Sequence, residues 1–172
     1  MKNFIVFFII FGSVNIVFAQ KKENRNGNLI GYIDKVDLLN GKFKTWFEKE
    51  YENYKPNKRV INKLKKKLKN ISVISFAGTW CHDSKHEIPR FYKIMESAEF
   101  DLKSNFKLIG ISRGKKTPNN LEQGYNINRT PTFIFYKNGK EIARYVEHAN
   151  ETMEKDIFAI VSGKKYKHPY DK

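Results

Sequence analysis

The sequence predicts an α/β domain with a mixed β-sheet, and three observations support this. Short apolar, β-rich runs alternate with amphipathic segments of helical periodicity along most of the chain. One helical segment separates the runs at 71–77 and 106–112, and such a strand–helix–strand unit implies a parallel pair. The Asn138-Gly139 pair marks a tight hairpin, which adds an antiparallel strand. The chain has 172 residues, enough for one domain with extensions, and it contains no detectable repeat.

The first 19 residues read as a signal peptide and not as part of this domain. Lys2 gives a positive start, residues 4–11 are apolar, and Val17 and Ala19 occupy the positions that a signal peptidase reads. We expect cleavage after Ala19, export, and no lasting membrane anchor. The alternative is an uncleaved anchor, but polar residues interrupt a stretch that is already shorter than the ~20 apolar residues a spanning helix needs.

An N-terminal extension, residues 20–56, precedes the domain. Residues 20–30 are polar and read as a flexible lead-in. Residues 31–56 are too aromatic for a linker, so we expect them to pack on the domain, with a helix near 44–54 that ends before Pro56. The alternative is that these aromatic side chains line a substrate groove.

The domain itself spans residues 57–162, and a basic tail, 163–172, follows it. Its expected elements are, in order, a helix at 57–69, a strand at 71–77, a helix after Cys81 that Pro89 kinks, a strand at 106–112, a turn-rich connection to Tyr125, strands at 132–136 and 141–146, and a helix from Asn150.

The composition limits the classes of partner. Hydrophobic residues make up 40% of the chain and aromatic residues 15%, which fits a folded globular protein. The net charge is +15, but the basic residues are spread out, with one dense run at 63–69. There the lysines alternate with an apolar stripe that includes Leu64 and Leu68, so they form the solvated face of an ordinary helix. We therefore expect no nucleic-acid partner.

The only cysteine, Cys81, carries the functional prediction. It lies in the string Gly-Thr-Trp-Cys-His-Asp-Ser-Lys, where the strand at 71–77 gives way to a helix. A helix N-terminus favours negative charge, and the thiolate is the reactive form of cysteine. Ser84 stands where a dithiol enzyme would have its second cysteine. Cys81 is therefore expected to attack disulfides and to need an external thiol for release. A buried, inert cysteine is the alternative, which its polar neighbours disfavour.

The Trp80-Cys81-x-x-Ser84 motif, with Thr130-Pro131 directly before a hairpin, resembles the thioredoxin family. The similarity covers about residues 57–162. The other matching positions are Phe76, Lys85, Pro89 and the turn at 137–139. The resemblance implies a thioredoxin-like fold, with a central mixed sheet of four to five strands flanked by helices, here with an N-terminal helical extension. Together with the export signal, it points to bacterial periplasmic or secreted relatives with a monothiol W-C-x-D-S motif.

The resemblance also implies roles for the site residues. Cys81 would be the nucleophile and Ser84 a hydrogen-bond donor to its thiolate. The expected substrate-contacting residues are Trp80, His82, Thr130 and Pro131, with Pro131 as the family's cis-proline. The partners would be protein or small-molecule disulfides and thiols, and no cofactor is expected.

This chain departs from the family pattern at three places. Ser84 replaces the resolving cysteine, and His82-Asp83 replaces the Gly-Pro pair of thioredoxin itself. Ser75 falls where thioredoxin has a buried acid. Turnover through an internal disulfide is therefore not open to this chain, which favours isomerisation or reduction of mixed disulfides.

Two other functions remain as alternatives. One is a redox-inactive binding module that docks a protein or peptide. The other is a copper or zinc site formed by Cys81, His82 and His86, since the two histidines are four residues apart on the expected helix.

Overall fold

The computed structural model describes residues 22–23 and 26–171. The expected signal peptide, residues 1–19, lies outside this range. Within the described residues, no helix is both long and apolar enough to cross a bilayer.

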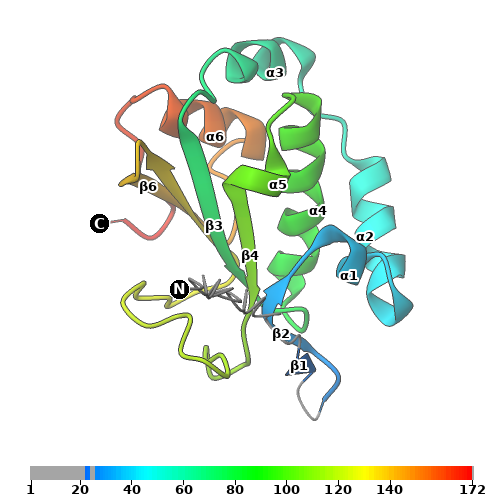
Figure 1. Ribbon diagram of the computed structural model, residues 1–172. Helices are drawn as coiled ribbons and strands as arrows, with labels where there is room; N and C mark the ends of the chain where they lie inside the picture. Colours follow the sequence, from blue (N-terminus) through cyan, green and yellow to red (C-terminus); the bar gives the residue numbers. More distant parts are fainter. Residues whose placement is uncertain (1–21, 24–25, 172) are drawn as a thin grey trace, which may run out of the picture.

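A twisted sheet forms the centre of the molecule (Figure 1), in the strand order β1-β2-β4-β3-β5-β6. The strands are β1 (Lys22–Glu23), β2 (Leu29–Ile33), β3 (Ile71–Ala77), β4 (Phe106–Gly110), β5 (Thr132–Lys137) and β6 (Lys140–Val146). Strands β3 and β4 are parallel and every other pair is antiparallel. Because β1 has only two residues, the main sheet has five strands. This confirms the predicted mixed α/β sheet.

The turn between β5 and β6 explains why that hairpin was predictable from sequence. Asn138 and Gly139 both have positive φ, 52° and 78°. Two residues of positive φ form the turn whose twist matches that of paired strands, and Asn and Gly adopt this conformation at low cost.

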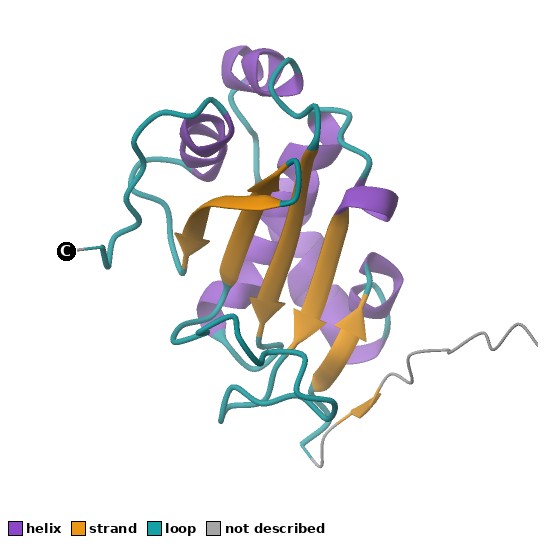
Figure 2. Cartoon of the chain, turned by 60° about the vertical axis from the view of Figure 1, so that its left-hand side comes forward, coloured by secondary structure: helices purple, strands orange, loops and turns teal. Residues whose placement is uncertain are grey.

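Helices cover one face of the sheet, and an irregular segment covers part of the other (Figure 2). The helices are α1 (Lys35–Leu38), α2 (Gly41–Asn53), α3 (Lys58–Lys65), α4 (His82–Ser97), α5 (Leu102–Asn105) and α6 (Met153–Val161). The larger core is formed by α2, α3, α4 and α6 against the sheet. On the other face, Leu121, Tyr125 and Ile127 pack on a small cluster that includes Phe76 and Ile134.

The extension joins the sheet, which the sequence analysis did not anticipate. Residues 29–33 form β2 along β4, where the end of a lead-in and the start of a packed aromatic segment were expected. Leu29 and Ile33 are buried, and Gly31 lies opposite Gly110. A Cβ on Gly110 would lie only 2.4 Å from the carbonyl oxygen of Leu29, so glycine is required for this close approach.

Helices α2, α3, α4 and α6 lie close to their expected positions, and the short helices α1 and α5 were not expected. Helix α2 begins three residues before the expected 44–54 helix and buries Phe43 and Phe47 in the main core. The Asn57 side chain caps α3 by accepting hydrogen bonds from the backbone N–H groups of Arg59 and Val60. Pro89 lies buried inside α4.

Candidate functional site

Cys81 lies at the junction of strand and helix, as its sequence context predicted. It is the N-cap residue of α4, in extended backbone conformation, and it is half-buried. Its backbone N–H donates to the carbonyl of Gly78 (2.8 Å), and its carbonyl accepts from Lys85 (3.1 Å). These two bonds fix the backbone and place the side chain at the first turn of α4, where unpaired N–H groups favour a negative charge.

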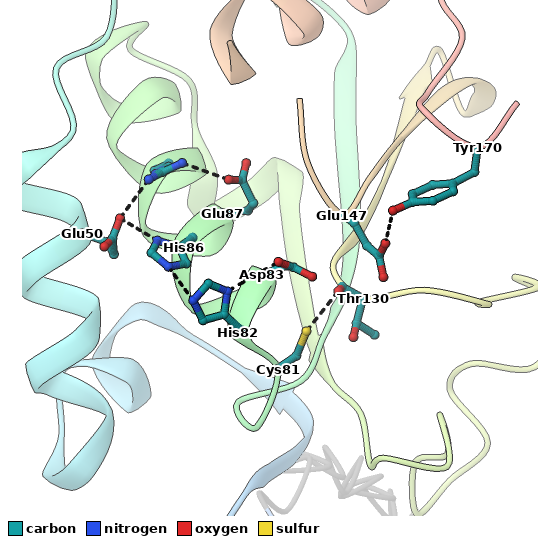
Figure 3. A network of polar contacts seen from close by, with 10 residues as sticks. Glu50, Cys81, His82, Asp83, His86, Glu87, Thr130, Glu147 and Tyr170 are labelled. Atoms are coloured by element: carbon teal, nitrogen blue, oxygen red, sulfur yellow. Dashed lines mark hydrogen bonds and ion pairs between the residues drawn. The ribbon is translucent and has the colours of Figure 1, made fainter. Parts of the chain in front are cut away.

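The loop before β5 brings Thr130 and Pro131 to the sulfur. The Thr130–Pro131 bond is cis, as the resemblance implied, and both residues are buried. The Cys81 thiol donates to the carbonyl oxygen of Thr130 at 3.1 Å (Figure 3). The carbonyl of Pro131 accepts from the backbone N–H of Glu147 (2.8 Å). The Cys81 sulfur therefore faces the backbone of this loop.

Ser84 lies beneath the same junction. It is 2% exposed, and its hydroxyl accepts a hydrogen bond from the backbone N–H of Gly78 at 3.2 Å. Among the described residues, no hydrogen bond joins Ser84 to Cys81, so its role as a donor to the thiolate stays a prediction. The observed bond shows a second role for Ser84, because it holds the loop that precedes Cys81.

Ser75 occupies the middle of β3, fully buried. Its hydroxyl has no hydrogen-bond partner within the described range of the chain. A serine here keeps the position polar but supplies no carboxylate.

Contacts of the indole ring fix the position of the Trp80 side chain. The indole N–H donates to the carbonyl of Ile111 at 2.8 Å. A Cβ on Gly78 would lie 2.5–2.8 Å from ring atoms of Trp80, so the ring packs directly on that glycine. The guanidinium of Arg113 lies over the Trp80 ring, 4.9 Å from its centroid.

A network of polar side chains begins at His82 and leads into the protein (Figure 3). The Nε2 atoms of His82 and His86 are 3.2 Å apart, so only one of the two rings donates across this contact at a time. The Nδ1 of His86 lies 3.0 Å from Oε2 of Glu50 on α2. Burial favours the neutral form of Glu50, but His86 and Arg90 outweigh it and hold the pKa of Glu50 below its ordinary value.

The inner end of the network is a buried acid. Arg90 bridges Glu50 and Glu87, at 3.1 Å from each. The hydroxyl of Tyr145 donates to Glu87. Burial raises the pKa of Glu87, although Tyr145 and Arg90 act in the opposite direction. Sequence analysis missed this network. The available signal was Glu87 and Arg90, spaced i,i+3 among the apolar residues of a helix.

The alternative metal site does not assemble. His82 and His86 face each other, but the sulfur of Cys81 points toward Thr130, away from the rings (Figure 3). In the part of the chain that the structure describes, no group of three or more His, Cys, Asp or Glu side chains is arranged to hold a metal ion.

The basic tail returns to the neighbourhood of the loop before β5. Tyr170 donates its hydroxyl proton to the carboxylate of Glu147, and Arg129 lies 3.8 Å over the Tyr170 ring. Tyr166 donates to Asp156 at 3.0 Å. The tail is therefore packed on the domain.

Known proteins resemble this chain in sequence and in fold. Thioredoxin H9 of Arabidopsis thaliana is 28% identical over 91 residues, which cover 53% of this chain and 60% of that protein. The crystal structure of a protein of unknown function from Pseudomonas aeruginosa has the same fold, with a TM-score of 0.50 at 15% identity over 70% of this chain and 81% of that one. Residues 53–159 match the family model described as Thioredoxin. Since the match covers more than half of the chain, this protein belongs to the thioredoxin family.

Proposed function

We propose that the protein is a monothiol thiol–disulfide exchange protein in which Cys81 is the nucleophile. The observation that carries the proposal is the contact of the Cys81 sulfur with the Thr130 carbonyl, at the tip of α4 and beside cis-Pro131. A helix N-terminus favours negative charge, and the attacking form of a cysteine carries one. The backbone of the 130–131 loop offers an extended substrate a surface next to the sulfur.

The reaction consists of two exchanges. The Cys81 thiolate attacks one sulfur of a substrate disulfide, forms a mixed disulfide with it, and expels the other sulfur as a thiolate that takes a proton from water. A second thiolate, from a small-molecule thiol or from another cysteine of the substrate, then attacks the mixed disulfide. It bonds to the substrate sulfur and expels the Cys81 thiolate. Each exchange makes one disulfide and breaks one, so the protein needs no oxidant of its own.

Ser84 sets the lifetime of the intermediate. A hydroxyl is not a nucleophile toward disulfides, so the mixed disulfide persists until an outside thiol arrives. This favours reduction of mixed disulfides or isomerisation over net oxidation of dithiols.

Trapping of adducts tests the proposal. The protein is incubated with an excess of a peptide dimer whose two chains are joined by one disulfide, without added thiol, and is analysed by intact mass under non-reducing conditions. Wild type should gain the mass of one half of the peptide disulfide, and a reductant should remove it. Cys81→Ser should gain nothing. Absence of a reducible adduct on wild type would instead favour a redox-inactive binding module.

We further propose that residues 1–19 direct export and that the protein acts outside the bacterial cytosol, in the periplasm or after secretion. The apolar run and the residues at the signal-peptidase positions, Val17 and Ala19, support this. Export fits a disulfide substrate, because disulfides persist in oxidising compartments. Expression of the full chain in a bacterium should yield a periplasmic product that begins at Gln20. An uncleaved protein in the cytosolic fraction would contradict the proposal.

A further inference from the structure

A basic, aromatic cleft lies between the extension and the active-site loop. Its volume is about 470 Å³. Three cationic side chains line it, Lys42 from α2, Lys85 from α4 and Arg113 from the segment after β4. Trp46 and Trp80 form apolar parts of its wall. No acidic residue is among the described residues that line it.

The three cations have no carboxylate partner in the described part of the chain. Lys42 contacts the backbone carbonyl of Asn26, at 3.4 Å, and the face of Phe43. Arg113 lies over Trp80. By contrast, Arg90 and Arg129, which also lie near the site, each pair with a carboxylate. Uncompensated cations in a concave surface focus a positive potential and attract anions.

The cleft shares residues with the segment that carries Cys81. Trp80, in its wall, directly precedes Cys81, and Lys85 follows Cys81 by one helical turn. Thr79 links the loop before Cys81 to the N-terminal extension. Its hydroxyl accepts from the backbone N–H of Leu29 (3.1 Å) and donates to Asn28 (3.3 Å). A ligand in the cleft therefore has a fixed position relative to the reacting sulfur.

The wall contributed by α2 lies outside the part of the chain that matches the family model. Its residues Lys42, Phe43 and Trp46 precede residues 53–159, which match that model. The extension thus adds a recognition surface to a family domain.

We propose that this cleft binds acidic side chains of the polypeptide substrate, next to the cysteine that reacts with Cys81. The planar guanidinium of Arg113 can bind a carboxylate through two parallel hydrogen bonds, and Lys42 and Lys85 add positive charge around it. The aromatic walls contact the apolar part of the bound segment. This proposal names the substrate class of the proposed function, namely disulfide-containing polypeptides that have acidic residues beside the cysteine.

Both tryptophans of the chain line the cleft, so intrinsic fluorescence reports binding there directly. The probe is a ten-residue Gly/Ser peptide with four glutamates and no cysteine, and its twin has glutamines in their place. The titration uses the Cys81→Ser protein at low salt. Because neither partner reacts covalently, the result is independent of whether Cys81 performs disulfide exchange.

The glutamate peptide should shift tryptophan emission saturably, and added salt should weaken it. The glutamine twin should produce no saturable shift. A Lys42→Gln/Lys85→Gln/Arg113→Gln variant should lose about tenfold in affinity (about 1.4 kcal/mol), which lies within the range that three exposed ion pairs contribute together. The matched control, Lys63→Gln/Lys66→Gln/Lys67→Gln, removes the same charge from exposed positions on and just after α3 and should lose about threefold at most.

Four results would overturn the proposal. The first two are equal binding of the glutamate and glutamine peptides, and an equal loss of affinity in the cleft variant and the control variant. The third is an equal fluorescence response to free glutamate at the same carboxylate concentration. The fourth is a single-stranded oligonucleotide that binds more tightly than the glutamate peptide and loses affinity in the cleft variant. Thermal unfolding followed by circular dichroism checks each variant, and Arg113→Gln alone replaces the triple variant if that one does not fold.

Discussion

The sulfur of Cys81 lies 3.1 Å from the carbonyl oxygen of Thr130, although 49 residues separate them in sequence. The contact joins the first turn of α4 to the loop that carries cis-Pro131. The proposed nucleophile and the proposed substrate surface are therefore one structural unit. Within that unit, the Ser84 hydroxyl accepts a hydrogen bond from the backbone N–H of Gly78.

Restoring a resolving thiol should change the fate of the intermediate. In a Ser84→Cys variant, the new thiolate attacks the Cys81 sulfur of the mixed disulfide and expels the substrate thiolate. The adduct with a disulfide peptide should then decay without added thiol and leave an internal disulfide, which intact mass reads as a loss of two hydrogens. The wild-type adduct, treated in parallel, should persist. Equal lifetimes would mean that position 84 does not control release.

The two buried serines should respond differently to removal of the hydroxyl. Ser84→Ala leaves the buried N–H of Gly78 without its acceptor, which should destabilise the fold by about 1–3 kcal/mol. Ser75→Ala removes a buried hydroxyl that has no partner among the described residues, so it should be neutral or stabilising. Urea unfolding of both variants provides the comparison, and a larger loss for Ser75→Ala would show that its hydroxyl has a structural role.

Glu87 should make stability depend on pH. Burial raises its pKa above the ordinary value of 4.5, so the folded state binds this proton more tightly than the unfolded state does. Its contribution to stability is therefore favourable below pH 4.5 and is lost as pH rises through the folded pKa. Glu87→Gln does not titrate. The stability of this variant relative to wild type should increase as pH rises from about 4 to 7.

Urea unfolding at several pH values measures that difference. A flat profile would mean that Glu87 titrates alike in both states. A profile of the opposite slope would mean that Tyr145 and Arg90 outweigh burial at this carboxylate.

The pairing of β2 with β4 should depend on Gly110. A Cβ there would meet the Leu29 carbonyl oxygen at 2.4 Å, so Gly110→Ala must push β2 away and should cost about 1–3 kcal/mol. Gly114→Ala is the matched control, because its Cβ would meet only the Ser112 hydroxyl, at 3.9 Å, and it should change stability by less than about 0.5 kcal/mol. Equal effects in thermal unfolding would show that the close approach at Gly110 does not limit the pairing.

The sequence predicted the central sheet well, because its signals are local. The apolar runs at β3, β4 and β5 are long enough to be unambiguous, and Asn138-Gly139 requires a tight turn. Strand β2 was missed because it has five residues with a glycine at its centre. Its pairing depends on the contact with Gly110, 79 residues away, which no local pattern reveals.

Only the site residues that belong to sequence motifs were predictable. Motif spacing identified Cys81 and the Thr130-Pro131 loop. The network from His86 through Glu50 and Arg90 to Glu87 brings together residues of α2 and α4. The basic cleft likewise combines residues from four separate parts of the chain, 26–28, 42–46, 79–85 and 113. Such assemblies follow from tertiary packing, so periodicity and spacing did not indicate them.

The most direct test of the central claim is the lifetime of the Cys81 mixed disulfide. The wild-type adduct with one chain of the disulfide-linked peptide dimer is isolated, freed of thiols, and followed by intact mass over hours, with and without added small-molecule thiol. The account predicts a stable adduct alone and rapid release of the peptide when thiol is added. Failure of wild type to form the adduct, or its decay at the same rate in both samples, would contradict the account.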